Sequence, residues 1–340
     1  MTISLSTRPT EPETSAPATE AHRPSPATIR ARAFVAAHQP AAVALGTSLA
    51  LQIGDPETFA TALRHGLARL SDPEYLAGQQ RVAPGLGTIH GVRSPLMAAV
   101  ARGFRRASRH DRPTTLLFLA DRLFREPHLE TRWLAFDLLG RTMAADPERT
   151  WQLLRRAARD AADWITVDSL AHLYAAGLAA EPFRWAELEQ LAYSPSRWER
   201  RLIGSTIATM TNGSRPFDRA PELVGRALPL LGQLIGDAEP DVQKALSWAY
   251  RSLARLEPET TTAALRVEAN RAIATDDGHR AWVVRDSLTK LDPAAAAEIH
   301  ALMTGIRRRP GALSTSAAAT TAGRFGALPD PILHPEPPLT

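Results

Sequence analysis

The sequence predicts an all-α protein folded as a HEAT-like or armadillo-type helical-repeat solenoid. Ala, Leu, Arg and Glu, which have high helix propensity, dominate the middle of the chain. No alternation of apolar and polar residues lasts long enough to indicate a strand. Paired helical stretches recur at intervals of roughly 30–45 residues, the period of two-helix repeats that stack into a curved array.

The expected helices lie between short breaks that contain Pro, Gly or Asp, residues that begin or end helices. The first half gives 27–38, 41–52, 56–70 and 72–82, then a loop rich in Gly and Pro, then 95–110, 113–125, 128–144 and 147–162. The second half gives 164–178, 183–192, 196–211, 219–236, 239–255, 258–273, 279–290 and 293–306. One helix of each pair is expected to line a concave face.

Both ends of the chain are rich in Pro, Ser and Thr and poor in large apolar residues. Segments of this composition cannot bury enough apolar surface to fold. We therefore expect disordered tails at 1–26 and 309–340, and one helical-repeat domain at 27–308.

The composition excludes several kinds of site. The 340 residues include no cysteine, so neither a disulfide nor a thiolate metal site can form. No two histidines have the i, i+3 or i, i+4 spacing of a helical metal site, so no metal is expected. The sequence has no signal pattern, and no apolar run approaches the roughly 20 residues of a membrane span. The expected location is the cytoplasm.

The basic residues favour a polyanionic partner. The net charge is +4 and the pI is about 9.9. Only Lys244 and Lys290 among the 40 basic residues are lysines, and arginine is the side chain that forks onto phosphates.

Helix 164–178 carries the clearest candidate for a site. Trp164 and Asp168 are four residues apart and therefore lie side by side on one face. Another face carries the expected core stripe, Val167, Leu170 and Tyr174. The small side chains of Ala171 and Ala175 are expected to leave room over the carboxylate. The alternative is a solvated aspartate beside a half-buried tryptophan.

Helix 239–255 has a buried stripe and a basic stripe on opposite sides. The buried stripe is Val242, Leu246, Ala249 and Leu253. The basic stripe is Lys244, Trp248, Arg251 and Arg255. A basic stripe alone usually means a solvated face, but a tryptophan within it exposes apolar area unless a ligand covers it. We favour nucleic-acid contact here.

Helix 196–211 opens with three arginines, Arg197, Arg200 and Arg201, and arginines in a first turn oppose the helix dipole. A phosphate would explain Arg200 and Arg201. An ordinary salt bridge to an Asp or Glu of the next repeat would explain them equally well.

Together these helices resemble the AlkD branch of the AlkC/AlkD family of DNA alkylation repair glycosylases. The resemblance rests on three motifs in register: Trp164-x-Thr-Val-Asp168, Trp198-x-Arg-Arg201, and Gln243-Lys244-Ala-Leu-x-Trp248-x-x-Arg251. Two upstream stretches look like earlier repeats of that family: Gly91-Val92-Arg93-Ser94-Pro95 and Glu130-x-Arg132-x-x-Ala135. The resemblance covers roughly residues 74–307.

The resemblance implies a solenoid that cradles duplex DNA in its concave face. It implies hydrolysis of the N-glycosidic bond of N3- and N7-alkylated purines, with no metal or cofactor. By the match, Asp168 is the catalytic carboxylate, and Trp164 and Trp248 are the aromatics that hold the deoxyribose of the lesion. Arg201 takes the place of an arginine that contacts the DNA backbone. The full set of expected DNA contacts is Arg201, Arg200, Lys244, Arg251, Arg255 and Arg93.

This chain departs from the family at two positions. Ile165 stands where the family usually has an acidic residue, and Asp163 where it often has a second aromatic. The departure at Ile165 removes an expected polar contact near the Asp168 carboxylate and leaves the carboxylate itself in place.

The residues fit this chemistry independently. An N3- or N7-alkylpurine is cationic and leaves without protonation, and a carboxylate stabilises the sugar cation that remains. Two alternatives stay open: a self-resistance glycosylase that excises bulky natural-product adducts, and a non-catalytic scaffold that binds DNA or protein. The expected partner is duplex DNA containing alkylated purines, bound by a monomer.

Overall fold

The computed structural model describes residues 25–82, 87–211 and 220–324. Helices α1 to α16 and four short 3-10 segments make up this part of the chain. Its only β pairing is an isolated bridge between Thr88 and His128. The prediction of an all-α protein is confirmed.

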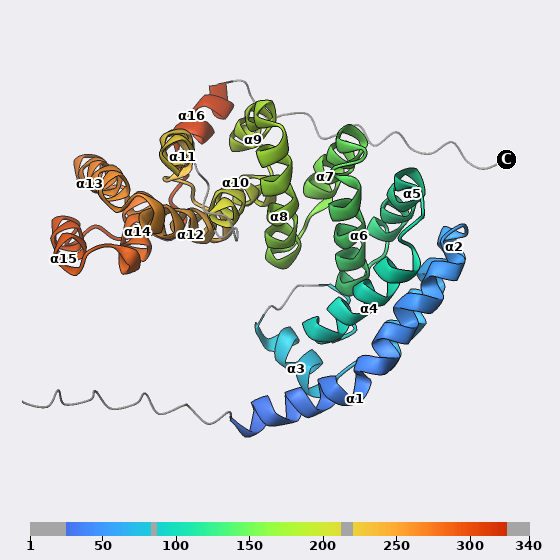
Figure 1. Cartoon of the computed structure of the whole chain (residues 1–340). Helices are drawn as coiled ribbons and strands as arrows, with labels where there is room; N and C mark the ends of the chain where they lie inside the picture. The colour runs from blue at the N-terminus through green and yellow to red at the C-terminus, as the bar shows by residue number, and fades with distance from the viewer. Residues whose placement is uncertain (1–24, 83–86, 212–219, 325–340) are drawn as a thin grey trace, which may run out of the picture.

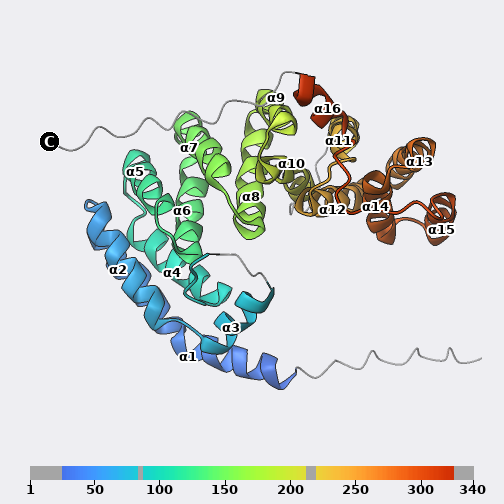
Figure 2. The same ribbon diagram turned by 180° about the vertical axis from the view of Figure 1, so that it is seen from behind.

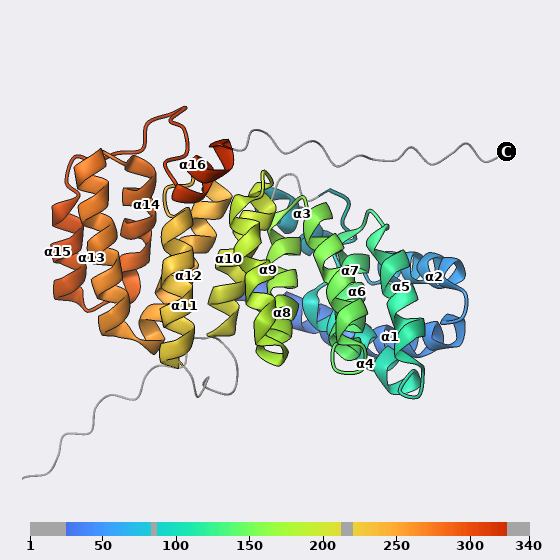
Figure 3. The same ribbon diagram turned by 90° about the horizontal axis from the view of Figure 1, so that it is seen from above.

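The helices form two rows along an open arc (Figures 1 and 2). Along the inner row, successive helices pack on one another: α4 (Ser94–Ala107), α6 (Leu129–Thr142), α8 (Trp164–Ala180), α10 (Arg197–Met210), α12 (Pro240–Leu256) and α14 (Gly278–Ser287). The outer row covers them: α5 (Pro113–Phe124), α7 (Pro147–Asp160), α9 (Trp185–Gln190), α11 (Ala220–Leu234) and α13 (Pro258–Thr275). From above, the helices lie side by side along the length of the molecule (Figure 3).

Four further helices lie at the ends of the array. They are α1 (Pro26–Leu49), α2 (Pro56–Arg69), α3 (Pro73–Val82) and α15 (Pro293–Leu302). Helix α1 packs on α4, α2 on α5 and α6, and α15 on α13.

The Pro and Asp breaks in the sequence are helix starts. Seven of the described helices after α1 begin with a proline as their first residue: Pro56, Pro73, Pro113, Pro147, Pro240, Pro258 and Pro293. Proline suits this position because the first helical N–H has no partner within the helix. Six of the described helices are capped by an aspartate whose carboxylate accepts first-turn amides: Asp55, Asp72, Asp146, Asp163, Asp277 and Asp292.

The prediction of separate helices at 27–38 and 41–52 is wrong, because α1 runs through Pro40 without a break. A proline inside a helix loses one hydrogen bond. Tight packing against α4 holds the second half of α1 in place, since a Cβ at Gly46 would overlap the carbonyl of Val100. With the following turn, this stretch spans Pro26–Gln52 and contains an 18-residue window with a mean hydropathy of 1.3, so by length and composition alone it could cross a membrane. Its buried residues, from Ala42 onward, belong to the protein core.

The prediction of a disordered tail from residue 309 is wrong for residues 309–324. The amide of Thr315 donates to the carbonyl of Gly236 (2.8 Å), and the carbonyl of Ala312 lies 3.0 Å from Nε2 of His279. Helix α16 (Ala317–Arg324) then packs against α11. The remaining tail predictions, for residues 1–24 and 325–340, lie outside the described residues.

Helix α8 is held against the outer row by an aromatic contact. The ring of Trp151, from α7, is fully buried and lies 4.7 Å from the ring of Tyr174. Gly177 lets this indole approach, because a Cβ there would lie 2.7 Å from the Trp151 ring. This contact sets which side of α8 faces away from the outer row.

Candidate active site

Helix α8 presents Trp164 and Asp168 on its accessible side. Asp163 caps the helix by accepting hydrogen bonds from the amide and the hydroxyl of Thr166, both at 2.7 Å. Trp164 is 38% exposed and the side chain of Asp168 is 22% exposed. Helix α7 meets a different side of α8, through Tyr174, and α8 belongs to the inner row of helices along the arc (Figure 1).

Beyond Asp168 the accessible stripe differs from the sequence prediction. Ala171 and Ala175, expected to lie over the carboxylate, are buried. The exposed residues one and two turns further are His172 and Ala176. His172 and Ala176 follow Asp168 by four and eight residues and so share its side of the helix. Ala171 follows it by only three residues and lies on the buried side.

The carboxylate of Asp168 is held by α10. The guanidinium of Arg201 forks onto it, with Nε donating to Oδ1 (3.1 Å) and Nη2 to Oδ2 (2.8 Å). The hydroxyl of Ser205 donates to Oδ1 at 2.6 Å. Arg201 and Ser205 are one turn apart on α10, so a single helix face supplies all three donors. Because both of its oxygens accept hydrogen bonds, the carboxylate group of Asp168 is held in one orientation.

Arg201 lies behind the carboxylate. Its side chain is 7% exposed, and its third nitrogen, Nη1, donates to the backbone carbonyl of Asp241 (2.7 Å). Arg201 thus links α8 to the start of α12 across α10. In this arrangement it braces Asp168, and a phosphate contact by Arg201 stays a prediction.

Trp248 lies on the other side of α10. It is half-buried on α12 and packs against the core. Since α10 packs between α8 and α12, two interaxial spacings of about 8–10 Å each separate the helix of Trp164 from that of Trp248. The helices of the two indoles therefore lie on either side of α10, and the described contacts include none between the two rings.

The predicted faces of α12 are confirmed. Its apolar stripe is fully buried: Val242, Leu246, Ala249 and Leu253. On the other side, Lys244 and Arg255 are exposed, and neither has an ion pair among the described residues. Arg251 instead donates to a carboxylate oxygen of Asp286 on α14, at 2.6 Å. Two of the expected cations on this stripe therefore have no ion pair within the part of the chain that the structure describes.

Comparison with known proteins assigns the family. The model of the DNA alkylation repair enzyme family matches residues 63–291, about two thirds of the chain. The chain belongs to this family. A search of curated proteins gives no match. The matched region runs from α2 to just beyond α14 and contains each candidate site residue, whereas α1, α15 and α16 lie outside it.

In this family member Arg200 forms an ordinary salt bridge. Its Nε donates to Oδ2 of Asp237 (2.7 Å), and its Nη1 donates to the carbonyls of Ser194 (2.8 Å) and Pro195 (2.9 Å). The alternative that the sequence left open, an acidic residue of the next repeat, therefore accounts for Arg200. Its expected DNA contact has no support in this arrangement.

Arg93 is also bound within the protein. Its Nε lies 2.5 Å from Oδ2 of Asp72, and its guanidinium stacks over Tyr75 at 5.1 Å. Asp72 caps α3 through the amide of Glu74 (2.9 Å). This cluster holds α3 against the start of α4, so Arg93 fixes the fold at that position.

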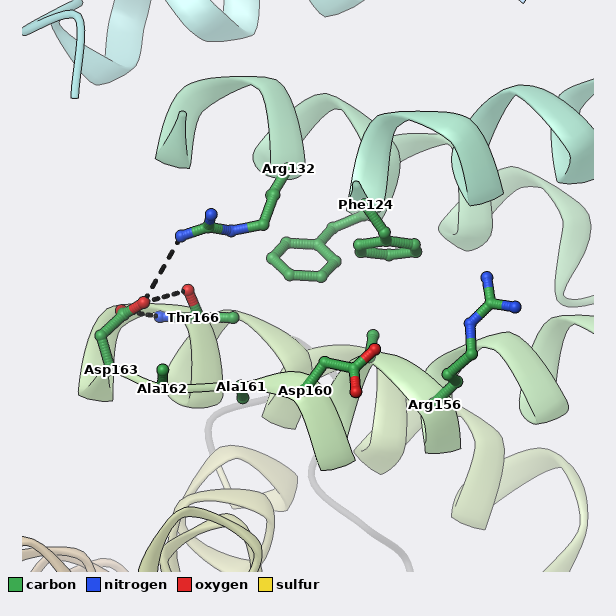
Figure 4. A pocket seen from close by; sticks show the side chains of 10 residues that line it. Phe124, Arg132, Arg156, Asp160, Ala161, Ala162, Asp163 and Thr166 are labelled. Atoms are coloured by element: carbon green, nitrogen blue, oxygen red, sulfur yellow. Dashed lines mark hydrogen bonds and ion pairs between the residues drawn. The ribbon is translucent and has the colours of Figure 1, made fainter. Parts of the chain in front are cut away.

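The two departures from the family pattern have structural roles. Asp163 caps α8 and lies 3.5 Å from Nη2 of Arg132, beside a cavity of about 120 Å³ between α5, α6, α7 and α8 (Figure 4). Ile165 packs with Leu129 and Trp133 in a small apolar cluster. Ile165 thus makes apolar contacts where the family usually has an acidic residue. The polar contact to the Asp168 carboxylate, besides those of Arg201, comes from Ser205 on α10.

A tryptophan followed four residues later by an aspartate recurs on two other inner helices. These pairs are Trp133–Asp137 on α6 and Trp282–Asp286 on α14. Burial raises the pKa of Asp137, and its nearest arginine nitrogen is 3.7 Å away. The side chain of Asp286 is 42% exposed, and the described contacts to it reach one oxygen. Among the three, Asp168 is distinguished by donors on both oxygens, which the sequence spacing alone could not show.

Proposed function

We propose that this protein is a DNA glycosylase that hydrolyses the N-glycosidic bond of cationic N3- and N7-alkylated purines in duplex DNA. The observation that carries the proposal is the braced, partly exposed carboxylate of Asp168 on the inner row of helices, one turn from the exposed Trp164. A scaffold that only binds DNA gains nothing from an anion on this face, because the anion repels phosphates.

The chemistry needs a fixed negative charge more than it needs an acid. The alkylated base already carries a positive charge, so it departs without protonation. The sugar then becomes an oxocarbenium ion, which a preorganised carboxylate stabilises. A carboxylate oxygen can accept about two hydrogen bonds. Oδ1 of Asp168 accepts two and Oδ2 accepts one, so Oδ2 keeps a lone pair to face the sugar cation or orient the attacking water.

Binding of the damaged nucleotide follows from the neighbouring side chains. In this proposal Trp164 and Trp248 hold the sugar from either side, and cation–π attraction to a sugar cation contributes about 0.5–2 kcal/mol each. Lys244 and Arg255 on α12 are exposed, have no ion pair among the described residues and would bind phosphates. In this proposal Arg201 and Ser205 position Asp168.

The test is single-turnover base release from a duplex oligonucleotide that carries one 7-methylguanine. We expect Asp168→Asn to slow release by about 10² to 10³-fold, the typical effect of losing a preorganised charge. Asp137→Asn is the matched control, because it removes a carboxylate at the same spacing from a tryptophan on the adjacent inner helix. We expect its rate to stay within about threefold of wild type.

Equal release by wild type and Asp168→Asn would refute the proposal. So would no release by wild type from 7-methylguanine, 3-methyladenine or bulky N3-adenine duplexes that it binds, which would indicate a scaffold. Release confined to the bulky adduct would assign the protein to self-resistance.

A further inference from the structure

A second cavity lies on the outer side of the molecule, away from Asp168. It has a volume of about 520 Å³ and is bounded by α7, α8, the turn at Leu191–Tyr193 and the start of α10. Small-molecule sites commonly have volumes of about 300–1,000 Å³. Tyr174, in its wall, follows Asp168 by six residues on α8 and therefore points about 120° away from it.

The floor of this outer cavity holds a buried phenol. Tyr174 is 2% exposed, and its ring packs on Trp151. The described contacts include no hydrogen bond to its hydroxyl group. Burial raises the pKa of Tyr174, so the group stays an O–H donor at any ordinary pH. The hydroxyl oxygen is not among the fully buried polar atoms that lack a partner, so it is accessible from the cavity and can donate to a bound molecule there.

One wall carries two arginines of α7 with different surroundings. Arg155 is paired with Glu187 at 3.2 Å, and Glu187 also accepts from Nε1 of Trp151 at 2.9 Å. Arg159, one turn further along the same face, is exposed and has no ion pair among the described residues. Within the described part of the chain, the cavity thus offers a cation without an ion pair in addition to the phenol.

The remaining wall combines an apolar surface with one carboxylate, that of Glu199. Leu191, Pro195 and the ring of Tyr193, which is 41% exposed, give it an apolar surface. The carboxylate of Glu199 accepts from the hydroxyl of Ser194 and has no cationic partner among the described residues. A ligand with a second negative charge, such as a phosphate dianion, would be repelled there.

We propose that this outer cavity binds a small aromatic monocarboxylate. The carboxylate lies between the Tyr174 hydroxyl and the Arg159 guanidinium, and the ring lies against Tyr193 and Pro195. Charge-assisted hydrogen bonds from both donors fix the anionic group, and the apolar wall covers the ring.

The test uses isothermal titration of the full chain with indole-3-acetate, with indole-3-acetamide as the neutral control. We expect saturable 1:1 binding of the acid, and binding of the amide at least tenfold weaker. Arg159→Gln and Tyr174→Phe should each weaken binding of the acid by roughly tenfold or more. Both variants should keep the thermal unfolding of wild type, since Arg159 is exposed and the Tyr174 hydroxyl makes no described hydrogen bond.

Three results would overturn the proposal. One is the absence of saturable binding for indole-3-acetate, benzoate and 2-naphthoate alike. Another is equal affinity for acid and amide, or an affinity that neither variant changes. The third is tighter binding of phenyl phosphate than of benzoate, which would show that Glu199 does not exclude a dianion.

Discussion

The hydroxyl of Ser205 offers a sharp test of how the carboxylate of Asp168 is positioned. Ser205→Ala removes one hydrogen bond of 2.6 Å to Oδ1 and leaves the Arg201 fork and the net charge intact. A hydrogen bond to a charged group contributes about 1.5–3 kcal/mol, and 1.36 kcal/mol corresponds to a tenfold rate change. Because Arg201 still holds both oxygens, we expect the low end of this range, about a tenfold slower release of 7-methylguanine.

The assay is single-turnover base release at saturating enzyme, with DNA binding measured in parallel by fluorescence anisotropy. Binding should be unchanged, because Ser205 is fully buried. Thr206→Val is the matched control: it removes a neighbouring buried hydroxyl that has no hydrogen-bond partner in the structure. A rate for Ser205→Ala within twofold of wild type, or an equal loss in the control, would refute the positioning role.

Three other perturbations have defined outcomes. Burial raises the pKa of Asp137, so its charged form destabilises the folded state and stability is lost as pH rises through that pKa. Asp137→Asn should therefore increase the free energy of unfolding at pH 7 in urea titrations, and the gain should vanish below about pH 4, where the unfolded carboxyl is protonated too. Lys244→Gln and Arg255→Gln should each flatten the salt dependence of DNA binding by about 0.9 in log–log slope; an unchanged slope would place the phosphates elsewhere. Gly46→Ala should destabilise the protein by about 1–3 kcal/mol, because the new methyl group overlaps the carbonyl of Val100; wild-type stability would show that α1 can shift freely.

The arginine pairings show what one-dimensional patterns leave undecided. The sequence placed Arg200 and Arg201 in one helical turn and could not choose between phosphate and protein partners for either. Asp237 and Asp168, their partners, lie 37 and 33 residues away along the chain. Which acid meets which arginine depends on how neighbouring repeats stack, and side-chain spacing within one helix does not determine that stacking.

The sequence by itself determined the helical-repeat class, most helix starts, and the two faces of α12, because helix geometry fixes which residues share a side. It also determined the pairing of Trp164 with Asp168 through their four-residue spacing. Only the tertiary structure decided that α1 continues through Pro40, that residues 309–324 dock against α11 and its neighbours, and that Ser205 braces the carboxylate. These features depend on contacts between segments far apart in the chain, and their packing energy overrides the local preference of a proline or a low-complexity segment.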